Sequence, residues 1–209
     1  LQHISTLANE LEIPIHMHVH ENVQEVADSV SQHGVRPLER LNELGLISHL
    51  LQCVHTTQLE DFEIEIMADA GVTIVHCPAS NASLASGMCR TQDILDAGIN
   101  LCLGTDGAAS NNELNMFNEM RLAALFGKAT ANNAAATTAW DVLTMATVNG
   151  ARALGMEEAL GTLETGKLAD CVAVDLDHLN SQPVYDPVST LVYSVQSSQV
   201  NYVWVDGKL

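Results

Sequence analysis

Basic residues are scarce in this sequence. It contains 8 Lys and Arg against 26 Asp and Glu, which gives a formal net charge of −18 at pH 7. A surface of this sign repels phosphate backbones, and no segment carries the basic stripe that nucleic-acid-binding proteins use. The composition therefore excludes nucleic acids and other polyanions as expected partners.

Long apolar runs are also missing. No stretch approaches the ~18 uncharged apolar residues of a membrane-spanning helix. The first residues, LQHISTLANELE, lack the basic and apolar regions of a secretion signal. The five cysteines form no C-x-x-C pair, which indicates reduced thiols in a hydrophobic core rather than a disulfide framework or a thiolate zinc site. These absences predict a cytoplasmic protein with no membrane partner.

The sequence does contain a repeat of short apolar runs, each followed by an amphipathic segment. With 209 residues, 47% of them hydrophobic, the chain is long enough to bury one substantial core. Segments of helical character follow four such runs, IPIHMHV, LLQCVHT, VTIVHCP and INLCLGTDG. Repeated β-then-α units predict an α/β fold with a parallel sheet and helices outside it.

The pattern changes towards the C-terminus. The stretch TTAWDVLTMATVNGARALG is expected to be helical, with an apolar face that includes Trp140 and Leu143. From about Gly161 the sequence turns to short alternating runs, GTLETGKLADCVAVDLD and NYVWVDGKL, on either side of SQPVYDPVS. We therefore assign residues 1–160 to the main unit. Residues 161–209 are expected to form part of a small β-sandwich subdomain with a helical segment, completed by strands from elsewhere.

The segment HMHVHEN has a histidine at every second position, His16, His18 and His20, followed at once by Glu21. On a β-strand these three imidazoles would project from one face. Catalytic groups of parallel barrels lie at the carboxyl ends of the strands, so the three rings are expected to share a cavity there. The alternative is chance polarity on a strand edge.

Polar residues also stand at the ends of the other three predicted strands. His55 ends CVHT, His76 and Asn81 belong to HCPASN, and Asp106 belongs to GTDGAASNN. Taken one at a time, the histidines have a second interpretation as core residues, and TDG has one as a hairpin turn. Taken together, they form a set of nitrogen and oxygen ligands suited to a divalent metal with an open coordination position.

This combination of HVHE, CVHT, HCPASN and GTDGAASNN resembles the amidohydrolase superfamily, in particular its metal-dependent aminohydrolases. Longer runs, including GTDGAASNNELNMFNEMRLAALFGKA and MATVNGARALG, are similar to the family of bacterial deaminases of 5-methylthioadenosine and S-adenosylhomocysteine. The similarity extends over nearly the whole chain. It implies a (β/α)8 TIM-type barrel and hydrolytic deamination of an adenine ring, with release of ammonia and an inosine analogue.

The resemblance also implies roles for individual residues. His18 and Asp106 would bind one divalent metal, zinc in the first place, with iron, manganese or nickel as alternatives. Glu21 would be a proton shuttle that contacts the substrate ring, and Asp106 would also be the general base. His55 would be a catalytic residue that also contacts the substrate near the reacting centre, and Asn81 and Asp106 would be further substrate contacts.

Strand counting assigns this chain to one half of the family's barrel. With Asp106 on strand eight, the HMHVH strand is the fifth, so the chain resembles the C-terminal half, strands five to eight. The family's strand-one H-x-H pair is then absent. His16 and His18 could be that pair, but the strand count and the spacing to Glu21 oppose this alternative. On the preferred assignment, His16 and His20 match no essential position.

A half barrel has physical consequences. Two open sheet edges and unpartnered apolar faces predict a homo-oligomer or association with the N-terminal half. A metal held by two ligands alone would be bound weakly, so activity is expected to need that half. Three alternatives stay open for the function: a guanine or 8-oxoguanine deaminase, an s-triazine hydrolase of the same superfamily, or an inactive fragment that associates with itself.

Overall fold

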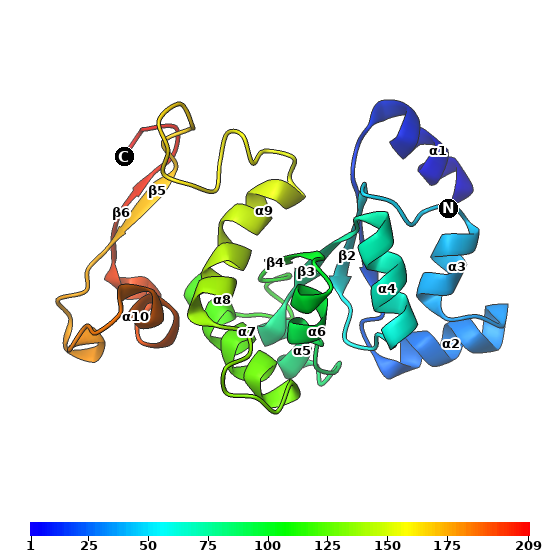
Figure 1. Cartoon of the computed structure of the whole chain (residues 1–209), viewed down its shortest axis with the longest axis horizontal. Helices are drawn as coiled ribbons and strands as arrows, with labels where there is room; N and C mark the ends of the chain where they lie inside the picture. The colour runs from blue at the N-terminus through cyan, green and yellow to red at the C-terminus, as the bar shows by residue number, and fades with distance from the viewer.

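A parallel four-stranded sheet forms the centre of the structure, a computed structural model that describes residues 1–209 (Figure 1). Its strands are β1 (Ile15–Val19), β2 (Leu51–His55), β3 (Thr73–His76) and β4 (Asn100–Leu103). They lie in this order, and each adjacent pair is parallel. The four predicted β-then-α units and the α/β fold are therefore confirmed. β1 and β4 each keep one unpaired edge.

Helices connect the strands and cover the sheet. Their bounds are α1 (Gln2–Leu11), α2 (Val23–His33), α3 (Pro37–Glu43), α4 (Asp61–Ala70), α5 (Pro78–Ser83), α6 (Thr91–Asp96), α7 (Met116–Thr130), α8 (Ala139–Ala146), α9 (Val148–Ala153) and α10 (Pro187–Tyr193). Two helices follow β1 where the sequence indicated one. Gly34 ends α2 with a φ of 78°, and Pro37 stands at the start of α3, where its fixed φ is favourable.

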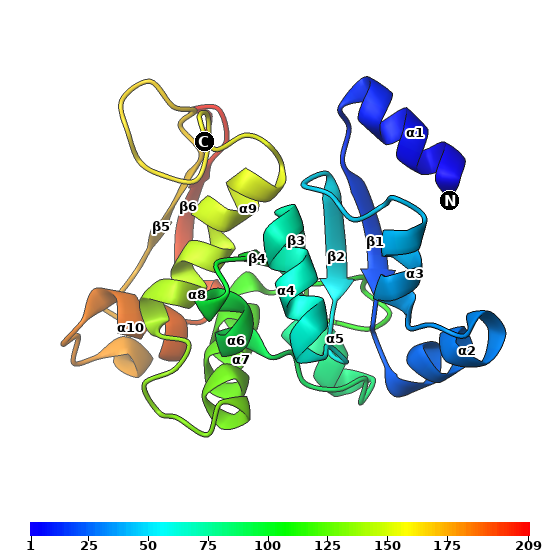
Figure 2. The same ribbon diagram turned by 45° about the vertical axis from the view of Figure 1, so that its right-hand side comes forward.

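The hydrophobic core lies between one face of the sheet and helices that include α3, α4, α7 and α8. Helix α4 lies in front of the sheet in Figure 2. A single cluster of 24 buried residues joins strand side chains such as Leu51 and Ile74 to helix side chains such as Leu38, Met67 and Met145. Burial of an aliphatic side chain of this size contributes about 1.5–3 kcal/mol. The cluster fixes the four strands relative to one another, and so it fixes the positions of their carboxyl ends.

The other face of the sheet carries a more polar set of residues. Near the start of the strands, His16 Nδ1 lies 2.8 Å from Gln52 Oε1, and Gln52 donates a hydrogen bond to the carbonyl oxygen of Ala153 in α9. Above this layer, Val54 and Cys102 belong to a cluster of four buried residues that also includes Val75 and Cys77. This face leads to the strand ends where the predicted functional residues lie.

The predicted long helix near residue 140 is interrupted. α8 and α9 are separate helices because Thr147 has non-helical angles, φ −129° and ψ −87°. The expectation that Trp140 lies on the apolar face is wrong, since its side chain is 64% exposed. The buried positions Ala139, Val142 and Met145 recur every three residues, and a residue adjacent to Ala139 is rotated by about 100° from that stripe.

The C-terminal residues form a two-stranded antiparallel sheet of β5 (Cys171–Val174) and β6 (Val200–Trp204). In Figure 1 this small sheet lies at the left, and α8 and α9 stand between it and the main sheet. Helix α10 lies between β5 and β6 in the sequence, yet its Val188 and Val192 belong to the main hydrophobic cluster. The two segments on either side of the expected boundary at residue 160 therefore share one core. The division into two domains stays a prediction.

Four of the five cysteines are buried and none is in a disulfide, as the sequence indicated. The fifth, Cys171, is half-buried in β5. None of the helices combines the length and the apolar character that crossing a membrane requires. The expected cytoplasmic location stays a prediction.

A buried ion pair lies on the helix side of β1. The guanidinium of Arg36 donates two hydrogen bonds to the carboxylate of Glu63, at 2.9 and 2.8 Å, and a further one to the carbonyl oxygen of Gln58. The side chains of Glu63 and His20 are fully buried, and His20 Nε2 lies 3.2 Å from Glu63 Oε1. Arg36 thus joins the start of α3 to α4 beneath the end of β1.

We expect Arg36→Met to lower the free energy of unfolding by about 3 kcal/mol, because it leaves the Glu63 carboxylate buried without its cation. Urea unfolding followed by circular dichroism measures this loss. Arg40→Met is the matched control, because Arg40 lies in α3, one turn after Arg36, and forms no ion pair. Equal destabilisation by the two variants would contradict a special role for the Arg36–Glu63 pair.

The same pair predicts a dependence of stability on pH. Burial alone raises the pKa of Glu63, but hydrogen bonds from His20 and Arg36 outweigh burial and lower this pKa to about 2. A lowered native pKa stabilises the fold above the unfolded pKa of 4.5, and this contribution is lost as the pH falls from there toward 2. The urea midpoint of the wild type should fall over that interval more steeply than the midpoint of Glu63→Gln.

Candidate functional site

Polar side chains from the first two strands meet at the carboxyl edge of the sheet. The ligand atoms of His18, Glu21 and His55 all lie within 4.8 Å of one another. His18 belongs to β1, Glu21 follows β1 by two residues, and His55 ends β2. The parallel register pairs Val19 with His55, which brings the two strand ends level. Three of the predicted site residues are therefore neighbours in space.

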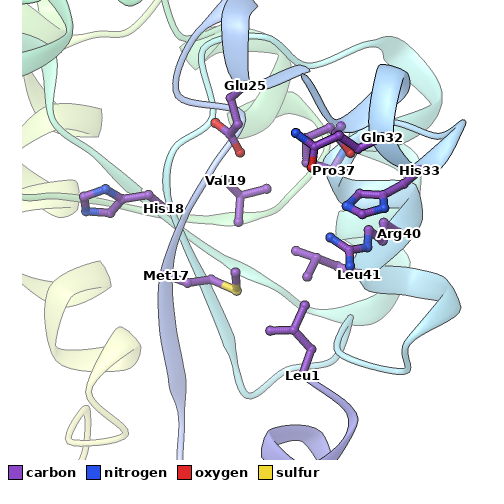
Figure 3. A pocket seen from close by; sticks show the side chains of 11 residues that line it. Leu1, Met17, His18, Val19, Glu25, Gln32, His33, Pro37, Arg40 and Leu41 are labelled. Carbon is purple, nitrogen blue, oxygen red and sulfur yellow. The ribbon is translucent and has the colours of Figure 1, made fainter. Parts of the chain in front are cut away.

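The three histidines of HMHVH do not all share one face, and that expectation is wrong for His20: His16 and His18 lie on one face of β1, but His20 does not. In Figure 3 the ring of His18 points to one side of β1, whereas Met17 and Val19 point to the other side, toward Pro37 and Leu41. His20 follows the strand with a φ of 55°, and this left-handed angle breaks the alternation of side chains. Its ring is fully buried with Glu63 on the helix side, away from the site.

His55 has one occupied and one free ring nitrogen. Its Nδ1 lies 2.8 Å from Asn81 Oδ1, and both side chains are buried. Its Nε2 is buried and makes no hydrogen bond, and the nearest carboxylate oxygen, Asp106 Oδ2, is 4.0 Å away. The ring stands edge-on to His18, with centroids 4.6 Å apart and planes at 79°. The backbone φ of His55 is 76°, which is a strained angle for a residue other than glycine. Strained backbone angles occur preferentially at functional sites.

Asp106 is held by three hydrogen bonds in the loop after β4. The hydroxyls of Ser80 and Ser110 donate to Oδ2 at 2.6 and 2.7 Å, and the backbone N–H of Gly107 donates to Oδ1 at 2.7 Å. Burial raises the pKa of Asp106, but these hydrogen bonds outweigh it and lower the pKa to about 2. The φ of Asp106 is 60°, again in the left-handed region. The residue is therefore an ionised carboxylate in a fixed orientation.

Glu119 is a residue that the sequence gave no reason to single out. It is fully buried in α7 and accepts hydrogen bonds from the backbone N–H of Ala79 at 3.1 Å and from Asn111 Nδ2 at 2.7 Å. Burial raises the pKa of Glu119. Ala79 belongs to the segment of Ser80, and Asn111 to the loop of Asp106. Glu119 thus ties together the two segments that hold the Asp106 carboxylate.

His76 lies outside the cluster of ligand atoms. It is buried at the end of β3, and neither ring nitrogen has a hydrogen-bond partner. Burial, together with the nearby His55, lowers the pKa of His76 to about 3, so the ring is neutral. Its interpretation as a core histidine agrees with this burial.

The chemistry of the cluster suits a divalent cation. Imidazole nitrogens and carboxylate oxygens are the ligands that zinc takes in catalytic sites. The buried Nε2 of His55 has no partner within the chain, and such an unsatisfied group at a strand end indicates that the site receives a further atom. His18, by contrast, has 56% of its side chain exposed, so its ring is accessible at the same edge.

A parallel α/β sheet with imidazoles and carboxylates at its carboxyl edge is characteristic of hydrolases built on barrels of the TIM type. The chain belongs to the amidohydrolase family, whose sequence profile matches residues 1–209. A curated relative from Teredinibacter turnerae, a 5-methylthioadenosine/S-adenosylhomocysteine deaminase, is 48% identical over 208 residues. This alignment covers 100% of the chain and 47% of the relative.

Two solved structures are similar to the structure of this chain. An adenosine deaminase from Xanthomonas campestris with bound zinc has a TM-score of 0.97 and 50% identity, over 99% of this chain and 47% of its own. The zinc complex of atrazine chlorohydrolase from Arthrobacter aurescens has a TM-score of 0.91 and 32% identity, over 98% of this chain and 45% of its own. The chain thus spans about half the length of the relatives it matches.

Proposed function

We propose that this chain supplies strands five to eight of a (β/α)8 barrel that hydrolytically deaminates the adenine ring of 5′-methylthioadenosine or S-adenosylhomocysteine. Curated relatives with this name, 48% and 46% identical over the whole chain, support the reaction. The chain covers 47% of each of them, and the sheet has free edges at β1 and β4. Both observations support a barrel that is completed by an N-terminal half.

His18 and Asp106 are the residues that would hold the divalent cation, with zinc as the first choice. Two protein ligands are fewer than the three of catalytic zinc sites, so the remaining ligands would come from the N-terminal half. When bound, the cation would lower the pKa of the attacking water. The bound zinc in the Xanthomonas campestris and Arthrobacter aurescens structures supports this choice of metal.

Glu21 is the residue we assign to proton transfer with the substrate ring. Its side chain is 24% exposed, and one carboxylate oxygen lies 3.9 Å from His18 Nδ1. Its backbone is fixed on both sides, because its N–H donates to Glu25 and its carbonyl oxygen accepts from Thr57. A carboxyl group on a fixed backbone can, in its protonated form, deliver a proton to a ring nitrogen, while the Asp106 carboxylate accepts one from the attacking water.

His55 completes the assignment as a contact near the reacting carbon. Its free Nε2 lies beside Asp106, so it can accept a hydrogen bond from a group bound between the two residues. Asn81 was expected to contact the substrate from the same edge. Its side chain is 2% exposed and faces His55, and a direct substrate contact stays a prediction.

The observation that carries this proposal is the meeting of His18, Glu21 and His55 within 4.8 Å at the strand ends, with Asp106 beside His55. The test is ammonia release by the assembled enzyme, this chain together with its N-terminal half. Release from 5′-methylthioadenosine and S-adenosylhomocysteine should exceed release from guanine. No ammonia from any purine nucleoside, with zinc bound, would refute the proposal.

Hydrolysis of an s-triazine is the second candidate function. The TM-score of 0.91 to atrazine chlorohydrolase favours it, although the identity of 32% is lower than the identity to the deaminases. Chloride release from atrazine by the same assembled enzyme separates the two functions. A rate above that of nucleoside deamination would favour the second candidate.

Zinc binding by the 209-residue chain can be measured without the reaction. We expect His18→Ala to abolish detectable zinc binding in a calorimetric titration, because the variant leaves one of the two assigned ligands. His16→Ala is the matched control: His16 is two residues away on the same face of β1 and is hydrogen-bonded to Gln52. Equal zinc affinities of wild type and His18→Ala would remove His18 from the metal site.

A further inference from the structure

Asn81 forms a buried pair with His55, which is a member of the cluster of ligand atoms. Asn81 Oδ1 lies 2.8 Å from His55 Nδ1, and the two side chains are 2% and 0% exposed. The Nδ2 group of Asn81 has no hydrogen-bond partner. The side chain of Asn81 therefore makes one hydrogen bond, through its oxygen, and its buried nitrogen makes none. Because an unsatisfied buried group is unfavourable for stability, we attribute the role of Asn81 to its bond with His55.

The direction of this hydrogen bond determines where His55 carries its proton. A carbonyl oxygen can only accept, so Nδ1 must donate, and the neutral ring then has a free lone pair on Nε2. The reversed amide would put the proton on Nε2. That N–H would have no acceptor, because Asp106 Oδ2 is 4.0 Å away and already accepts from Ser80 and Ser110.

We propose that Asn81 is a positioning residue that holds His55 in the tautomer protonated at Nδ1, so that the Nε2 lone pair faces the space among His18, Glu21 and Asp106. The inference deepens the proposed function, on which it rests, because a lone pair at this place suits a cation or a water proton. An Nε2–H would direct a positive hydrogen atom toward the cation instead. Asn81 acts through His55 and need not touch the substrate.

The segment that carries Asn81 is itself fixed. The backbone N–H of Asn81 donates to the carbonyl oxygen of Cys77 at 3.0 Å, and the carbonyl oxygen of Asn81 accepts from the N–H of Ser86 at 2.9 Å. Two residues earlier, Ala79 is bonded to the buried Glu119. The neighbouring Ser80 donates to Asp106. Two adjacent residues of α5 therefore orient two groups of the site. Ser80 orients the Asp106 carboxylate, and Asn81 orients the His55 imidazole.

The test reads the tautomer directly. Long-range ¹H–¹⁵N correlation spectra of the zinc-free 209-residue chain, labelled with ¹⁵N-histidine, distinguish the protonated from the free nitrogen of each ring. His55→Gln assigns the signals of His55 by their loss. We expect a single Nδ1–H tautomer for His55. A proton on Nε2 in the wild type would overturn the proposal.

Two variants of Asn81 and one control complete the experiment. Asn81→Leu, of similar size and without an acceptor, should lose the single tautomer and give a mixture. Asn81→Asp keeps the acceptor and should retain Nδ1–H. Ser80→Ala removes the neighbouring bond to Asp106 and should leave the His55 tautomer unchanged. An unmixed Nδ1–H signal in Asn81→Leu would overturn the proposal.

The result does not depend on catalysis. If Asn81→Leu fails to fold by circular dichroism, the wild-type spectrum decides alone: Nδ1–H supports the proposal, and Nε2–H overturns it. An Nδ1–H tautomer in a protein that releases no ammonia would refute the proposed reaction and leave the role of Asn81 intact. An Nε2–H tautomer in an active deaminase would refute the role of Asn81 and leave the proposed reaction intact.

Discussion

Replacing Glu21 by Gln should lower ammonia release by the assembled enzyme about 10²- to 10⁴-fold, the contribution of a positioned acid or base. Gln has the size of Glu but carries no proton that it can transfer to a ring nitrogen. Zinc content should stay unchanged, because Glu21 is not one of the assigned ligands. Turnover of 5′-methylthioadenosine, with elemental analysis of the same samples, measures both quantities.

Glu10→Gln is the control for this experiment. Glu10 is exposed on α1, so the substitution makes the same change in net charge outside the site. Undiminished turnover by Glu21→Gln would exclude Glu21 from proton transfer. A loss of zinc together with activity would instead make Glu21 a metal ligand. Its carboxylate is close enough to His18 and His55 for that role.

Asp106→Asn should have an effect of at least the same size, about 10²- to 10⁴-fold in turnover, and should also lower the zinc content. The substitution removes the negative charge that attracts a cation and the oxygen that accepts a proton. It also replaces one acceptor with an N–H₂ group, which must face the N–H of Gly107 or the hydroxyls of Ser80 and Ser110.

An exposed aspartate provides the comparison for this second variant. Asp96 is exposed at the end of α6 and accepts a hydrogen bond from Gln92. Asp96→Asn should leave turnover and zinc content at wild-type levels. If Asp106→Asn binds zinc as fully as Asp96→Asn and deaminates at the same rate, neither role of Asp106 survives.

The sheet was predictable because each strand is a short apolar run, and because a glycine follows α4 and α6 shortly before the next strand begins. These are local properties, and they gave the order and direction of β1 to β4. The misplaced helix boundaries depend on backbone angles at single residues. Thr147, for example, is followed by Val148, Asn149 and Gly150, which are weak helix formers, yet these three residues belong to α9. Helix propensity therefore does not locate the interruption at Thr147.

The site was predictable in part for the same reason. Residues at the carboxyl ends of parallel strands must gather at one edge, so His18, Glu21, His55 and Asp106 could be grouped in advance. The hydrogen-bond partners could not. Asn81 is 26 residues from His55, and Arg36 is 27 residues from Glu63, so only the folded chain selects these pairs. His20 was misplaced because strand periodicity no longer holds once φ becomes positive.

Helix α10 has a consequence for any attempt to dissect this protein. Val188 and Val192 are inserted into the core of residues that precede the boundary near residue 160. A deletion that ends the chain at that boundary would therefore open a cavity next to α7 and α8 rather than release an independent module. Natural recombination faces the same obstacle: a swapped C-terminal segment must bring a helix that fits the recipient's interior.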